Sequence, residues 1–77
     1  MDEITYLTKE GFENLQNKLN QLIHEERPHI AQMIAEAREK GDLSENAEYD
    51  AAKDAQAHLE LEIAQLQKLL ANVDIIE

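Results

Sequence analysis

The sequence predicts an all-α protein: a long antiparallel two-helix coiled-coil hairpin with an acidic tip. The 77 residues contain two glycines and one proline, and the long stretches of Ala, Leu, Glu, Gln and Lys favour helix. Apolar residues recur in steps of three and four, which is the spacing of helices that pack against one another. Gly41 divides the chain into two arms of similar length. A turn at this glycine would fold the second arm back along the first.

The first arm is expected to be one helix over about residues 8–40. Thr8 is a suitable N-cap, and Ile4–Leu7 would precede it in extended form. The apolar stripe runs through Phe12, Leu15, Leu19 and Leu22. Its phase then shifts near Pro28. A proline within a helical pattern predicts a kink in the helix there, not a break.

The second arm is expected to follow a tip at about residues 41–45 and to be helical over about residues 46–73. Its heptad seam consists of Leu59, Ile63, Leu66, Leu70 and Val73. Arms of about 30 residues give a rod about 45 Å long. The last residues, from Val73 to Glu77, would pack beside Ile4–Leu7. Residues 1–77 are therefore interpreted as a single coiled-coil hairpin domain.

Size, charge and composition limit what such a chain can do. A domain of 77 residues buries a modest core, which argues against a large enzyme pocket. Seventeen acidic and seven basic residues give a formal charge of −10, which disfavours free duplex DNA and anionic membranes and favours a basic partner or a cation. The absence of cysteine, of a signal peptide and of a membrane-spanning stretch predicts a cytoplasmic protein. A two-helix rod is also marginally stable, so weak self-association is expected.

Two carboxylates, Asp42 and Glu45, mark the predicted tip. Asp42, Ser44 and Asn46 supply capping side chains for the second helix. In one reading the two acids serve only this helix start: Asp42 or Ser44 caps the helix, and Glu45 complements its dipole. In the other reading the two carboxylates bind Mg²⁺, which prefers oxygen ligands. Two acids cannot enclose the ion, so a partner would have to supply further ligands and the site would be shared.

The tip and its flanks resemble a known family. The residues that carry this resemblance are Ile34–Glu39, Gly41–Leu43 and Glu45–Tyr49, with Leu7–Gly11 and Val73–Ile76 at the two ends. They are similar to the N-terminal coiled coil of the GreA and GreB transcript cleavage factors. The resemblance covers essentially the whole chain. The family's C-terminal, polymerase-binding domain has no counterpart in these residues.

The resemblance implies a role in transcription elongation. It implies that the coiled coil enters the secondary channel of bacterial RNA polymerase and stimulates endonucleolytic cleavage of backtracked nascent RNA. Asp42 and Glu45 would help to hold a second Mg²⁺, shared with the polymerase, which remains the enzyme. Arg38 and Lys53 match a small basic patch that contacts the RNA 3′ end. Asn46 and Tyr49 are expected to support the tip.

Other readings of the same residues remain open. A structural or adaptor coiled coil would only present helix faces to a partner, and an inhibitory relative would occupy the same channel without stimulating cleavage. Arg38 and Lys53 could be a solvated helix face, and Tyr49 a residue of the helix seam. GreA fits better than GreB because few basic residues follow Lys53.

Overall fold

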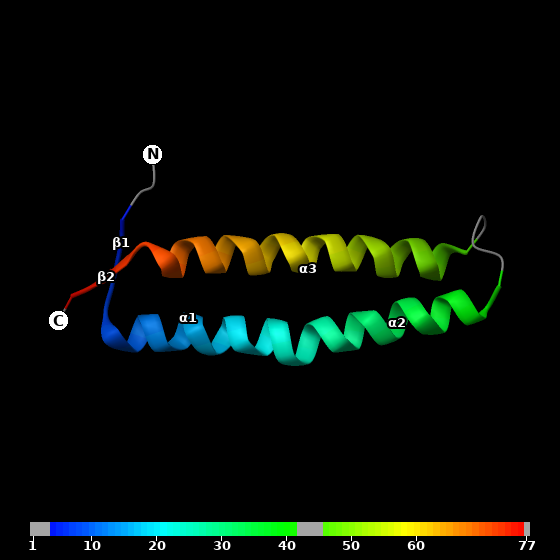
Figure 1. The fold of residues 1–77 in the computed structure, drawn as a ribbon, viewed down its shortest axis with the longest axis horizontal. Helices are drawn as coiled ribbons and strands as arrows, with labels where there is room; N and C mark the ends of the chain where they lie inside the picture. Colours follow the sequence, from blue (N-terminus) through cyan, green and yellow to red (C-terminus); the bar gives the residue numbers. More distant parts are fainter. Residues whose placement is uncertain (1–3, 42–45, 77) are drawn as a thin grey trace.

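A computed structural model describes residues 4–41 and 46–76, most of which are helical. The elements in order are β1 (Thr5–Leu7), α1 (Lys9–Gln21), η1 (Leu22–Glu26), α2 (Arg27–Glu39), α3 (Ala47–Ala71) and β2 (Val73–Ile75). Figure 1 shows that α1, η1 and α2 form one continuous arm and that α3 returns alongside it. The molecule measures 54 × 26 × 12 Å. The predicted mostly helical hairpin is confirmed, whereas supercoiling of its arms stays a prediction.

The first arm begins and ends with local signals. The Thr8 hydroxyl accepts a hydrogen bond from the backbone N–H of Gly11 at 3.0 Å and so satisfies a donor that the first helical turn leaves free. At the other end, Gly41 has a φ of +102°. Side chains disfavour this left-handed region, and glycine enters it freely, which makes it a common residue just after a helix. Single residues, Thr8 and Gly41, therefore mark where the first arm begins and ends, and both can be recognised in the sequence.

The middle of the first arm contains a π-helical segment, η1. The N–H of Arg27 donates to the carbonyl of Leu22, five residues earlier. Such a turn holds one residue more than an α-helical turn. The side chains after it are therefore rotated about the helix axis by about 100° relative to those before it. This rotation accounts for the phase shift of the apolar stripe between Leu22 and Ile30. The arm is unbroken, as predicted, and its irregularity lies just before Pro28, which occupies the first turn of α2.

The hydrophobic core lies where the two arms meet at mid-length. Leu22, Leu59 and Ile63 form a buried cluster with exposures of 9%, 6% and 2%. The partly buried residues that pack against it are Leu19, Ile23, Ile30 and Leu66. Towards the turn, the buried residues are Ala37 and Ala52, with exposures of 2% and 1%. Small residues allow the helix backbones to approach closely, so α2 and α3 come together tightly near the turn.

The outer faces of the arms are polar, and ion pairs cross between them. Arg27 makes a bidentate pair with Glu60, at 2.9 Å from Nε and 2.8 Å from Nη2. The hydrogen bond to Glu60 raises the pKa of Arg27 above its ordinary value. Lys18 lies 3.3 Å from Glu62. Among the described helices, none is long and apolar enough to cross a membrane.

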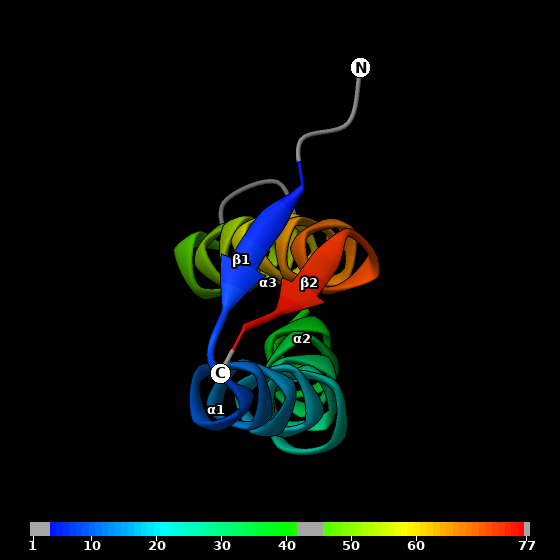
Figure 2. The same cartoon turned by 90° about the vertical axis from the view of Figure 1, so that its left-hand side faces the viewer.

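Two short strands correct the all-α prediction. β1 and β2 pair in parallel, with Thr5 opposite Val73 and Leu7 opposite Ile75. Figure 2 shows the strands side by side across the end of the hairpin, both running from the α3 side towards the α1 side. Parallel neighbours need a long crossover connection, which here is the whole hairpin. Of the expected neighbours, Thr5–Leu7 and Val73–Ile75 do meet, but Val73 belongs to this sheet and not to the helix seam.

Candidate functional site at the tip

The predicted functional tip lies at the end of the hairpin opposite the strands. There, α2 ends and α3 begins (Figure 1). Gly41 and Asn46 flank the turn, and four residues separate them in the sequence. Asp42 and Glu45, the predicted metal-binding pair, are among those four and lie outside the described residues. The described residues show the support of the two acids, which is the last turn of α2 with Gly41 on one side and Asn46 with the first turn of α3 on the other.

On the α2 side of this support, two backbone hydrogen bonds end the helix. The N–H of Lys40 donates to the carbonyl of Ala37 at 3.3 Å, and the N–H of Gly41 donates to the carbonyl of Arg38 at 3.1 Å. These bonds satisfy carbonyls that the last helical turn leaves without a partner. The chain then leaves α2 through the left-handed conformation of Gly41.

The α3 side is capped by Asn46. Its Oδ1 accepts a hydrogen bond from the backbone N–H of Tyr49 at 3.1 Å, and its carbonyl accepts from the N–H of Asp50 at 3.1 Å. Of the three capping candidates Asp42, Ser44 and Asn46, the N-cap of α3 is Asn46. An N-cap is the residue directly before the first helical residue, and α3 begins at Ala47.

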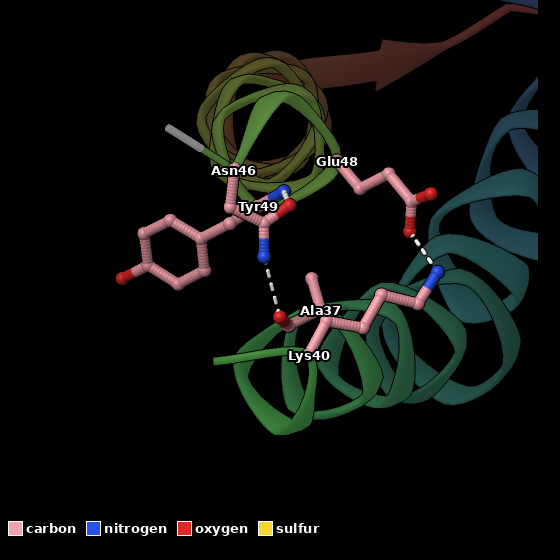
Figure 3. A network of polar contacts seen from close by, with 5 residues as sticks. All are labelled: Ala37, Lys40, Asn46, Glu48 and Tyr49. Carbon is pink, nitrogen blue, oxygen red and sulfur yellow. Dashed lines mark hydrogen bonds and ion pairs between the residues drawn. The ribbon is translucent and has the colours of Figure 1, made fainter. Parts of the chain in front are cut away.

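The Asn46 side chain also reaches across to the other arm. Its Nδ2 donates to the carbonyl of Ala37 at 2.6 Å, and the contact is partly buried. Figure 3 shows this bond on one side of the space between α2 and α3 and an ion pair between Lys40 and Glu48 on the other. The side chains of that ion pair are 59% and 64% exposed, so solvent screens it. The Asn46 bond is the better shielded of these two links.

The remaining predicted site residues lie close to the tip in sequence but are spread over both arms. Arg38 is exposed on α2. Lys53 is exposed on α3, where its Nζ donates to Gln56 Oε1 at 3.0 Å. Tyr49 joins the capping bond through its backbone, and its half-buried ring points away from the other labelled residues in Figure 3. That Arg38 and Lys53 contact RNA, and that Asn46 and Tyr49 support the tip, stay predictions.

A groove of about 320 Å³ opens beside the tip. Its lining residues come from both arms and are Met33, Glu36, Ala37, Lys40, Glu48, Ala51 and Ala52. The apolar share of this lining is mostly alanine, and Glu48 is already paired with Lys40. Within residues 4–41 and 46–76, no three acidic or histidine side chains gather closely enough to hold a metal ion.

Sequence reasoning missed the links that join the two arms at the tip. Ala37 contributes a carbonyl, which no side-chain pattern reveals. Lys40 and Glu48 did leave a signal, because they carry opposite charges a few residues before and after the turn. In a hairpin, such positions face each other across the arms.

Comparison with known proteins supports the resemblance inferred from the motifs. Residues 5–75 match the GreA/GreB family model described as "Transcription elongation factor, N-terminal". The transcription elongation factor GreA of Christiangramia forsetii is 49% identical over 77 residues, which are 100% of this chain and 49% of that protein. The GreA of Trichlorobacter lovleyi is 56% identical over 71 residues, covering 92% of this chain and 45% of that protein.

A third relative has the same relation to the chain. The GreA of Mycoplasma genitalium is 52% identical over 71 residues, which cover 92% of this chain and 44% of that protein. The chain thus spans about half the length of the curated relatives it matches. The family model covers nearly all of the chain, including both arms and the residues around the turn. The chain therefore belongs to the GreA/GreB family of transcription elongation factors, whose N-terminal domain it matches.

Proposed function

We propose that this chain is the channel-entering part of a GreA-type transcript cleavage factor. As an antiparallel coiled coil, it enters the secondary channel of bacterial RNA polymerase and stimulates endonucleolytic cleavage of backtracked nascent RNA. The polymerase performs the reaction, and this chain supplies carboxylates. The observation that carries the proposal is the pair Asp42 and Glu45, which falls in the sequence between α2 and α3. The end of α2 and the start of α3 lie together at one end of a rod 54 Å long.

The donor set of this link suits a shared Mg²⁺. Asp42 and Glu45 offer carboxylate oxygens, the ligands that Mg²⁺ prefers, and Mg²⁺ is commonly held by one or two carboxylates together with water and phosphate oxygens. Bound there, the ion would neutralise charge on the RNA phosphate and lower the pKa of a coordinated water molecule. The contribution of this chain is to carry the two carboxylates to the polymerase active centre on a stiff support.

The charge of the chain agrees with a partner that brings its own cations. A formal charge of −10 disfavours direct binding of free nucleic acid. Arg38 and Lys53 are exposed cations near the tip and are proposed to contact the phosphates of the nascent RNA 3′ end. Lysine provides charge there without the bidentate geometry of arginine.

Cleavage of RNA in a stalled, backtracked elongation complex with Mg²⁺ tests this proposal. The chain is added by itself and fused to the C-terminal half of the Christiangramia forsetii GreA, and shortened RNA is measured on a gel. The wild-type fusion should shorten the RNA, and Asp42→Asn and Glu45→Gln should abolish the stimulation. Glu13→Gln is the matched control, because it removes one carboxylate from an exposed position in the first turns of α1. Circular dichroism checks that every variant is helical.

The rival functions give different results in the same assay. An adaptor coiled coil would bind its partner equally well with Asp42 and Glu45 neutralised, and no variant would change the RNA. An inhibitory relative would slow elongation without releasing a 3′ fragment. Stimulation that survives the double change Asp42→Asn with Glu45→Gln would refute the proposed role of the acid pair.

A further inference from the structure

We propose that Asn46 is a positioning residue that sets the spacing of the two arms at the tip and thereby places Asp42 and Glu45 for cleavage. This inference rests on the proposed function. Asn46 is the residue directly after Glu45, and its side chain holds both arms: Oδ1 accepts from Tyr49 of α3, and Nδ2 donates to Ala37 of α2. Through this side chain, the two ends of the turn are tied to each other.

The two bonds use the amide in the one orientation that satisfies both partners. The Tyr49 backbone N–H is a donor and the Ala37 carbonyl is an acceptor, so the oxygen must face α3 and the nitrogen must face α2. A reversed amide would place donor against donor and acceptor against acceptor. Asn46 is therefore held at both ends of its side chain, and its rotation would break both contacts.

Two different atoms of the Asn46 amide make the cap of α3 and the bridge to α2, so substitutions can remove the bridge and keep the cap. Ser and Asp are about as good as Asn at the N-cap position, because each offers an oxygen to the first helical turn. Ser is too short to donate across to Ala37, and an ionised Asp has no donor at all. A residue needed only as a cap could be any of the three, whereas the bridge to α2 needs the amide nitrogen.

The surroundings of the bridge favour a defined spacing. Ala37 and Ala52 are almost fully buried, so the backbones of α2 and α3 are close at this level. The Ala37 carbonyl also accepts the N–H of Lys40, so the bridge fixes Asn46 to the last turn of α2. The nearby Lys40–Glu48 pair is exposed and screened by solvent, so it constrains the spacing less.

The inference predicts that losing the bridge changes the tip without unfolding the hairpin. Asn46→Ser keeps a cap and loses the bridge, and Asn46→Ala loses both. Lys40→Gln is the matched control, because it breaks the other described link across this end of the arms. Asn46→Asp adds a charge beside the acid pair, so it is used for the distance measurement alone.

The first measurement is the distance between the arms. Spin labels are attached to Glu39→Cys and Asp50→Cys, two exposed positions, and the natural sequence contains no cysteine that would compete. Electron–electron dipolar spectroscopy should show a longer or broader distance distribution for Asn46→Ser, Asn46→Asp and Asn46→Ala than for the natural residue and Lys40→Gln. The melting temperatures should follow the cap and not the bridge. Asn46→Ser should melt close to the natural protein, and Asn46→Ala should melt at a lower temperature than either.

The second measurement is cleavage by the fused factor at saturating concentration, as a function of Mg²⁺. Asn46→Ser should cleave at least about tenfold more slowly and need more Mg²⁺, since misplacing a reacting group by about 1 Å can cost on the order of a hundredfold. Its affinity for polymerase should be unchanged. A natural distance distribution together with natural cleavage in Asn46→Ser would overturn the inference, as would an equal effect of Lys40→Gln. Failure of the proposed function is recognised separately, by cleavage that persists without Asp42 and Glu45.

Discussion

Truncating Ile63 to alanine should destabilise the hairpin more than any single change on its outer faces. Ile63 is 2% exposed and belongs to the buried cluster with Leu22 and Leu59. The change removes three carbons, and about 0.8 kcal/mol for each buried carbon gives about 2.4 kcal/mol. Incomplete collapse of the cavity adds to this cost, and the better helix propensity of alanine offsets a part of it. The expected loss is about 2–3 kcal/mol.

This loss is large for a chain of 77 residues. Domains are stable by roughly 0.05–0.15 kcal/mol per residue, which gives about 4–12 kcal/mol for this length. A loss of 1 kcal/mol lowers the melting temperature of a small domain by about 4–8 °C. Ile63→Ala should therefore melt about 10–20 °C below the natural protein, as followed by the helical signal in circular dichroism.

The control for this prediction is Leu61→Ala, two residues away on the same helix. Leu61 is 56% exposed, and its truncation removes the same number of carbons from a largely solvated position. Its expected loss is below about 1 kcal/mol, since exposed substitutions have small effects. Urea titration at two protein concentrations separates this effect from any self-association. Equal losses for Leu61→Ala and Ile63→Ala would refute the assignment of the core to the middle of the hairpin.

Three further predictions test the ends and the surface of the arms. Thr8→Ala should lower the free energy of unfolding by about 1 kcal/mol by removing the cap of α1, and Thr8→Ser should recover most of it in the same urea titration. Gly41→Ala should lower the melting temperature, because a side chain at a φ of +102° costs about 1–2 kcal/mol, while Gly41→Asn should cost less. Arg27→Gln and Glu60→Gln should be non-additive in a double-mutant cycle, and this coupling should weaken in 1 M salt because the pair is exposed. An additive cycle would mean that the bidentate contact is not maintained in solution.

The candidate site could be predicted in part because some of its signals are local. Asn46 lies between the turn and a helical stretch, so a capping role follows from its neighbours in the sequence. The metal-binding role of Asp42 and Glu45 follows from the family resemblance alone, because capping and dipole effects by themselves explain acids at a helix start. The bond from Asn46 to Ala37 was not predictable. It joins residues nine positions apart in the sequence, and it forms only because α2 and the start of α3 pack against each other.

The sequence alone determined the elements whose causes are local. Helical periodicity, the Thr8 cap and the glycine at position 41 established two arms and a turn, because backbone conformation and capping depend on neighbours in the chain. The tertiary structure decided the rest: the π-helical segment that brings Ile30 back towards the core, and the parallel strands across the far end. These features depend on contacts between residues far apart in sequence, and those contacts become available once the arms are packed.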